Sequence, residues 1–191
     1  MPPGPERSAE LSKDVLRARA KWQYTGAWRP SFATPTEPGQ ESVWDYPRPP
    51  RIESDARRVV VRADGRVVAD SCRALRVVET ASPPAFYLPA YDVDVSLLER
   101  GSGSSLCEWK GAAYYWDLVA PERRTTRVAW SYPQPYPEFD SIREHFAFFP
   151  AALECWLDGG RVESQPGGFY GGWVTPEIVG PIKGQPGSTD W

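Results

Sequence analysis

Proline is unevenly distributed along this chain, and its positions limit where a β-sheet can form. Of the 21 prolines in 191 residues, 9 lie within residues 1–50, whereas residues 51–82 and 90–120 contain none. Proline lacks a backbone N–H and therefore interrupts a central strand. We expect the sheet to form in the two proline-free windows.

The same distribution predicts three segments. Residues 1–43 are expected to form an N-terminal arm and residues 44–162 a single β-rich domain. Residues 163–191 are expected to form a Gly/Pro-rich C-terminal extension, since the last 26 residues contain 4 prolines and 7 glycines. Six of the nine tryptophans lie in these flanking segments or near the ends of the domain, so we expect both segments to pack on it.

A short helix is expected in the arm. Leu11, Val15, Ala18 and Trp22 advance by 4, 3 and 4 residues, which places them on one face of a helix. Ser8 stands ahead of this apolar stripe and is therefore the expected N-cap.

Alternating apolar residues predict a mainly β domain. Asp64-Gly65 separates two such segments, and because an Asp-Gly pair favours a type I′ turn, a hairpin is expected there. In the next strand, Leu75 and Val77 are expected to face inward and Arg76 outward. The strands expected after the hairpin lie at residues 74–80, 112–119 and 127–132.

Composition and charge exclude several functional classes. The 22 basic and 25 acidic residues give a formal charge of −3, which argues against a general nucleic-acid binder. No stretch approaches the ~18 apolar residues of a membrane-spanning helix. The first residues lack the apolar core of a signal peptide. We therefore expect a cytoplasmic protein that binds neither nucleic acid nor a membrane.

Cysteine and histidine are too few for the usual metal centres. The three cysteines, Cys72, Cys107 and Cys155, have no CxxC spacing, which argues against a disulfide framework and against a structural zinc site. His145 is the single histidine, in a segment that alternates like a strand. We expect neither a metal nor another cofactor.

Several ordered blocks of the sequence carry a family resemblance. They are SVWDYPRPP (42–50), VADS (68–71), RALRVVET (73–80), PAFYLP (84–89), CEWKGAAYYW (107–116), AWSYP (129–133) and HFAFFP (145–150). Together these blocks resemble DUF427, a bacterial and fungal family named as a domain of unknown function. Residues 170–184 resemble an extension found in one branch of that family.

For the fold, the resemblance implies a single, strongly bent antiparallel sheet similar to the β-tent of Mss4-like domains. Many β-tent relatives bind zinc through paired cysteines, which this sequence lacks. For the activity, the resemblance implies only a nucleotidyltransferase label that the family has at times carried. Asp92 and Asp94 form a D-x-D pair that would chelate the metal of such an enzyme, or would remain two solvated carboxylates.

The segment around Cys107 is the best candidate for reactivity. A nearby lysine stabilises a thiolate, which is the reactive form of cysteine, so Cys107 is a candidate nucleophile and Lys110 its electrostatic partner. Glu79 or His145 would carry the proton. Residues 101–105, which precede this segment, are expected to form a flexible Gly/Ser loop. The alternative is that Cys107 is a buried structural residue.

A second group of residues suits ligand binding. Arg73 and Asp70 are candidate polar contacts for an anionic or planar ligand, or members of a structural turn and salt bridge. The aromatic residues expected to stack on the ligand, or to be part of the core, are Tyr87, Trp109, Tyr115 and Trp130.

Three functional hypotheses follow from these residues. The leading one is a non-metal β-domain that binds a small molecule or a peptide on the concave face of its sheet. The second is an enzyme, either with Cys107 as nucleophile or with a nucleotidyltransferase-like activity. The third is a structural protein whose arm and extension bind a partner, including a second copy of the chain to form a homo-oligomer.

Overall fold

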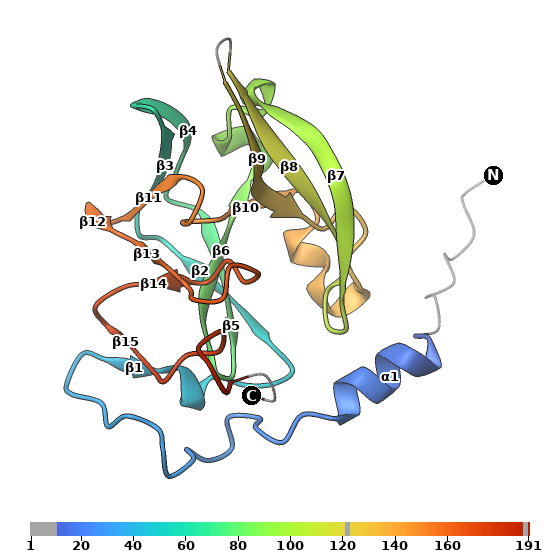
Figure 1. The fold of residues 1–191 in the computed structure, drawn as a ribbon, viewed down its shortest axis with the longest axis vertical. Helices are drawn as coiled ribbons and strands as arrows, with labels where there is room; N and C mark the ends of the chain where they lie inside the picture. The colour runs from blue at the N-terminus through green and yellow to red at the C-terminus, as the bar shows by residue number, and fades with distance from the viewer. Residues whose placement is uncertain (1–10, 121–122, 189–190) are drawn as a thin grey trace.

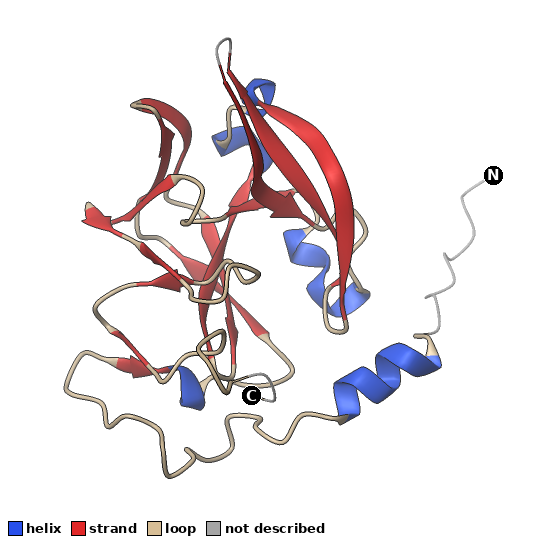
Figure 2. Cartoon of the chain, viewed as in Figure 1, coloured by secondary structure: helices blue, strands red, loops and turns tan. Residues whose placement is uncertain are grey.

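Most strands belong to two antiparallel sheets of unequal size in this computed structural model, which describes residues 11–120, 123–188 and 191 (Figure 1). The seven-stranded sheet has the spatial order β2 (Arg51–Asp55), β5 (Ala74–Glu79), β6 (Ser82–Pro89), β10 (His145–Phe148), β9 (Arg123–Ser131), β8 (Gly111–Ala120) and β7 (Leu98–Cys107). The four-stranded sheet has the order β12 (Gly160–Arg161), β11 (Glu154–Leu157), β3 (Val59–Ala63) and β4 (Arg66–Ser71). The predicted mainly β fold is confirmed (Figure 2).

Short elements connect and flank the two sheets. The one α-helix among the described residues is α1 (Lys13–Ala20). The 3₁₀ helices are η1 (Val43–Asp45), η2 (Ala90–Asp92), η3 (Val95–Leu97) and η4 (Pro137–Ile142). The remaining two-residue strands are β1 (Glu41–Ser42), β13 (Glu163–Ser164), β14 (Trp173–Val174) and β15 (Ile178–Val179). None of the described helices is long and apolar enough to cross a membrane.

The predicted helix of the arm is present, but its N-cap differs from the expected one. Ser12 precedes α1, and its hydroxyl accepts a hydrogen bond from the backbone N–H of Val15 at 3.3 Å. Ser8, the expected cap, lies outside the described residues. Val15 is the buried residue of α1, and Trp22 of the predicted stripe follows the end of the helix.

The predicted hairpin is confirmed as β3 and β4. Asp64 and Gly65 have φ angles of 48° and 79°, the left-handed values that a type I′ turn requires. Val59 and Val61 are buried on one face of β3, whereas Arg62 is exposed. The turn residues therefore predicted the hairpin, whose pairing shifts register between Val61 and Arg62.

The larger sheet is buried on both faces. On one face, Phe86 and Leu88 of β6 share an apolar cluster with Val59 and Val61 of the smaller sheet. The neighbouring residue Tyr87 points to the opposite face, where it belongs to a second, aromatic cluster. This alternation follows from the two-residue period of a strand, and it leaves the aromatic face to be covered by something other than the smaller sheet.

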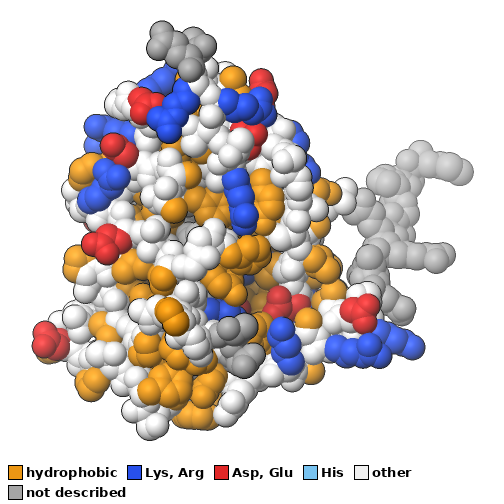
Figure 3. All heavy atoms as spheres, in the orientation of Figure 1, with side chains coloured by type: hydrophobic (Ala, Val, Ile, Leu, Met, Phe, Trp, Pro, Cys, Tyr) orange, Lys and Arg blue, Asp and Glu red, His pale blue; other side chains and the backbone are white. Residues whose placement is uncertain are grey.

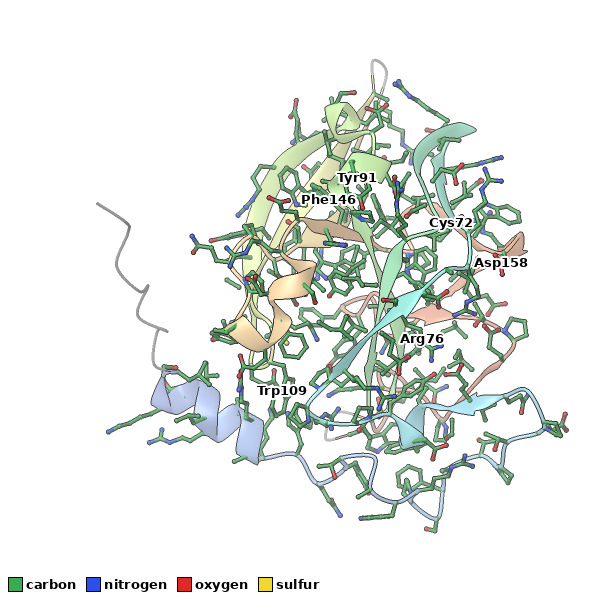
Figure 4. All side chains as sticks on the ribbon, turned by 180° about the vertical axis from the view of Figure 1, so that it is seen from behind. Cys72, Arg76, Tyr91, Trp109, Phe146 and Asp158 are labelled. Carbon is green, nitrogen blue, oxygen red and sulfur yellow. The ribbon has the colours of Figure 1, made fainter. Side chains whose placement is uncertain are left out.

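Arg76 is buried, so the prediction that it faces outward was wrong. Its side chain, labelled in Figure 4, is 11% exposed and pairs with Glu41, and it donates a hydrogen bond to the Tyr46 hydroxyl at 3.1 Å. The pKa of Glu41 is lowered, mainly by its hydrogen bond with Arg76. Residues of the arm pack over Arg76, and the sequence of β5 alone does not indicate this packing.

Residues 101–105 form part of strand β7, so the prediction of a flexible loop was wrong. The strand pairs with β8 from Leu98 to Cys107, with an irregularity between Arg100 and Ser104. A Cβ atom at Gly101 would lie 2.6 Å from the Asp117 Oδ1 atom. The glycine therefore permits a close approach between paired strands rather than a mobile segment.

The arm and the extension contact each other as well as the sheets. Strands β1 and β15 pair in parallel, with Ser42 opposite Val179. The rings of Trp44 and Trp191 lie 5.3 Å apart, and the backbone N–H of Lys183 donates to the Ala81 carbonyl at 2.7 Å. The division of the chain into three segments stays a prediction, as does the β-tent arrangement.

Candidate functional site

A cavity of about 530 Å³ lies on the aromatic face of the larger sheet. Strands β5 to β9 supply its floor, α1 and Trp22 one wall, and residues 169–172 of the extension another. Figure 3 shows this side of the molecule, where basic and acidic side chains lie next to apolar ones. The floor residues come from alternating positions of their strands: Val77, Glu79, Ala85, Tyr87, Ala113, Tyr115 and Trp130.

One end of this cavity, which we call the closed end, contains a carboxylate shared by two cations. Glu79 accepts a hydrogen bond from Arg48 Nε at 3.2 Å, and its other oxygen lies 3.5 Å from Lys110 Nζ. The side chains of Arg48 and Lys110 are 1% and 10% exposed. Burial acts to lower the pKa of Lys110, but its electrostatic interactions with Cys107 and Glu79 raise it above its ordinary value. The Lys110 ammonium therefore stays charged at neutral pH.

Two tyrosine hydroxyls are also at the closed end. Trp130 Nε1 donates a hydrogen bond to the Tyr87 hydroxyl at 3.1 Å. Burial raises the pKa of Tyr87 to about 12, and it raises the pKa of Tyr132 well above its ordinary value. Both phenols are therefore neutral hydrogen-bond donors at neutral pH.

The middle of the cavity has aromatic walls. The rings of Trp130 and Phe149 lie 4.5 Å apart, and the Tyr115 hydroxyl donates to Ser105 Oγ at 2.8 Å. The guanidinium of Arg127 lies 4.4 Å from the centre of the Tyr115 ring. These walls suit a planar apolar group, since aromatic rings stack with offset or edge-on geometry.

Trp22 and Lys183 complete the mouth of the cavity from the two flanking segments. Trp22 Nε1 donates to Glu108 Oε1 at 2.7 Å, and the Lys183 ammonium lies 3.9 Å from the centre of the Trp22 ring. Burial and the neighbouring charge of Arg48 lower the pKa of Lys183 to about 8. Sequence reasoning did not identify either residue as part of a site, because only the folded chain brings the arm and the extension together.

The cavity brings most of the predicted site residues together. Those that line it are Glu79, Tyr87, Cys107, Lys110, Tyr115 and Trp130. Trp109 is buried next to α1 and does not line the cavity (Figure 4); the Arg19 guanidinium lies 5.1 Å from its ring centre. His145 also does not line the cavity.

Arg73 and Asp70 lie away from this cavity. Arg73 pairs with Asp92 at 2.6 Å, and Asp70 pairs with Arg58 at 2.6 Å. Arg58, Asp70 and Arg73 are exposed, and ion pairs of exposed side chains add little to stability. Their geometry fits the structural alternative that the sequence left open for these two residues.

The D-x-D pair is also occupied by contacts within the chain. Asp92 accepts a hydrogen bond from the Ser71 hydroxyl at 2.7 Å in addition to its pairing with Arg73, and Asp94 lies 3.3 Å from Arg66. No group of three or more histidine, cysteine, aspartate or glutamate side chains among the described residues is placed to hold a metal ion.

The family model described as a domain of unknown function (DUF427) matches residues 51–159, more than half of the chain. The chain belongs to the DUF427 family. The matched DUF427 segment supplies Glu79, Cys107, Lys110 and the aromatic floor, whereas Trp22 and Lys183 lie outside it. A search of curated proteins found no match.

Proposed function

We propose that this DUF427 protein binds a small organic molecule in the cavity on the aromatic face of its larger sheet. The observation that carries the proposal is a volume of about 530 Å³ with aromatic walls and the buried Lys110–Glu79 pair at one end. Small-molecule sites are typically about 300–1,000 Å³ and combine apolar walls with a few convergent polar groups. The walls from α1 and the extension favour a small molecule over an extended peptide.

A cavity-filling substitution tests this proposal. Ala85 lines the cavity and is half-buried, so Ala85→Phe fills part of the space. Val67→Phe, at an exposed position of β4, is the matched control. The full-length proteins would be screened by thermal shift against nucleotides, amino acids, aromatic acids and cofactors. We expect hits that raise the Tm of the wild type and of the control but not of Ala85→Phe, because a ligand that binds only the native state stabilises it.

Two outcomes would contradict the proposal. The first is a wild-type protein that no compound stabilises. The second is a set of hits that stabilise Ala85→Phe as strongly as the wild type, since such compounds would bind elsewhere on the protein.

A specific observation also favours a second candidate, a covalent reaction at Cys107. Cys107 is the one cysteine that lines the cavity, and it lies close enough to Lys110 to affect the pKa of that lysine. Transfer of the Cys107 thiol proton to Glu79 would give a thiolate that adds to an activated double bond of the ligand. A C–S bond would form, the electron pair of the double bond would take the proton back from Glu79, and Lys110 would stabilise the negative charge in between.

Alkylation rates separate the two candidates. Peptide mapping after iodoacetamide treatment at neutral pH would give the rate at Cys107, with Cys107→Ser as the control for peptide assignment. A reactive nucleophile is expected to alkylate faster than the exposed Cys72. If Cys107 reacts no faster than an unperturbed thiol, the covalent candidate fails and the binding proposal is unaffected.

A further inference from the structure

The closed end of the cavity contains hydrogen-bond donors that have no acceptor among the described residues. Lys110 Nζ has an ion pair with Glu79 but no hydrogen bond, and the Tyr132 hydroxyl has no hydrogen bond. The Tyr87 hydroxyl accepts from Trp130 but donates to no described group. All three residues are more than nine-tenths buried. Three donors at one end of the cavity are therefore available to an acceptor on a bound ligand.

These donors face open space rather than packed protein. Side-chain polar atoms that are both sealed from solvent and unpaired occur, within the described part of the chain, at Arg76, Trp109, His145 and Trp156. Lys110 Nζ and the Tyr132 hydroxyl have no hydrogen bond but are not among these sealed atoms. Since both residues line the cavity, their donor atoms open onto it.

The charges around the closed end favour a ligand with one negative charge. Arg48 and Lys110 are positive there and Glu79 is negative, which leaves one net positive charge. In a buried site, charges are normally compensated. A monoanion would provide that compensation and would also supply an acceptor for these donors.

We propose that the ligand is an organic acid, whose carboxylate accepts hydrogen bonds from Lys110, Tyr87 and Tyr132. Its apolar body lies along the aromatic walls formed by Trp130 and Phe149. This inference rests on the proposed function, because it names the chemical class of the ligand for the same cavity.

A carboxylate fits this end better than a phosphate group does. Phosphate sites typically use the paired N–H groups of arginine or the N–H groups of a helix N-terminus. None of the described lining residues is an arginine, and Arg48 is already bonded to Glu79, Tyr24 and Thr80. One ammonium and two phenols match the two oxygens of a single carboxylate.

Matched acid and amide pairs test the inference. The probes are benzoate and benzamide, naphthoate and naphthamide, and indoleacetate and indoleacetamide, titrated into the full-length protein with ligand-observed NMR as the readout. In each pair the two molecules have nearly the same shape, so their difference reports on the charge. The variants are Lys110→Met and Tyr132→Phe, with Lys13→Met on the exposed side of α1 as the control.

We expect the acids to bind at least about tenfold more tightly than their amides, the effect of hydrogen bonds to a charged group. Lys110→Met should weaken acid binding far more than amide binding and so abolish this preference, whereas Lys13→Met should retain it. Tyr132→Phe, which removes one hydroxyl from a buried ring, should reduce acid binding more than amide binding. It keeps the test decisive if Lys110→Met does not fold.

The remaining outcomes overturn one proposal or both. If acids and amides bind equally in the cavity, or if the acid preference persists in both Lys110→Met and Tyr132→Phe, the inference fails while the proposed function stands. If no member of any pair binds and the wider screen also finds no ligand, the proposed function fails together with the inference.

Discussion

Glu79 is shared by two buried cations. This arrangement predicts that removing the carboxylate destabilises the protein more than removing the charge of Lys110. Glu79→Gln leaves Arg48 and Lys110 as neighbouring buried cations without a carboxylate. Breaking a buried ion pair by removing one partner costs about 3–5 kcal/mol. Glutamine still accepts one hydrogen bond from Arg48, so we expect the lower value, about 3 kcal/mol.

Lys110→Met should cost much less. Glu79 keeps Arg48, whose guanidinium is held in place by the carbonyl oxygens of Thr80 at 2.9 Å and Tyr24 at 3.0 Å. Methionine also removes the penalty for burying an ammonium and keeps most of the side-chain volume. We therefore expect a change within about 1 kcal/mol, as for volume-conserving apolar replacements.

Urea denaturation at pH 7 measures both values. For a chain of this size, 3 kcal/mol corresponds to a fall in Tm of about 6–12 °C, so thermal unfolding provides an independent measurement. Glu99→Gln is the control, because Glu99 pairs with Arg124 on the surface at 2.8 Å and should change stability by less than about 1 kcal/mol. If Lys110→Met destabilises the protein as much as Glu79→Gln does, Arg48 does not hold Glu79 and the reasoning is wrong.

Three further measurements test other parts of the structure. Burial lowers the pKa of Lys183 from 10.5 to about 8, so between these pH values the folded chain binds fewer protons at Lys183 than the unfolded chain does. The free energy of unfolding should therefore rise with pH across this interval. The midpoint of urea denaturation should rise less with pH in Lys183→Met than in the wild type. A Cβ atom at Gly171 would overlap the indole ring of Trp130. Gly171→Ala should therefore lower the free energy of unfolding by about 1–3 kcal/mol. An effect no larger than that of Gly160→Ala on the surface would contradict this. Cys155 is fully buried with a raised pKa, so Ellman's reagent should modify the exposed Cys72 in the native protein and reach Cys155 only on unfolding.

The sequence predicts the strands that depend on local patterns better than those that depend on their partners. The Asp64-Gly65 hairpin followed from backbone geometry alone. Strand β6 was not expected, because it contains Pro83, Pro84 and Pro89. In the structure, β10 pairs with β6 only from Tyr87 to Pro89, and the first two prolines lie at the irregular part of its pairing with β5. Proline is tolerated there because no continuous series of interstrand hydrogen bonds is interrupted.

The candidate site divides in the same way. Cys107 and Lys110 were identified because they are close in sequence, and Glu79 because a carboxylate can carry the proton of the thiol. Trp22 and Lys183 were missed because they are 161 positions apart in the numbering and meet only across the mouth of the cavity. No local pattern carries that information.

This division has a consequence for how the cavity would select its ligand. The donors proposed to bind the carboxylate, Lys110, Tyr87 and Tyr132, all lie inside the segment that defines the DUF427 family. The walls that limit the size of the ligand's body include Trp22 and residues 169–172, which lie outside it. Recognition of the ligand's carboxylate and selection of the size of its apolar body would then depend on different parts of the chain. Changes in the arm or the extension would alter the affinity for an acid and its amide together, whereas changes at the closed end would alter the ratio between them.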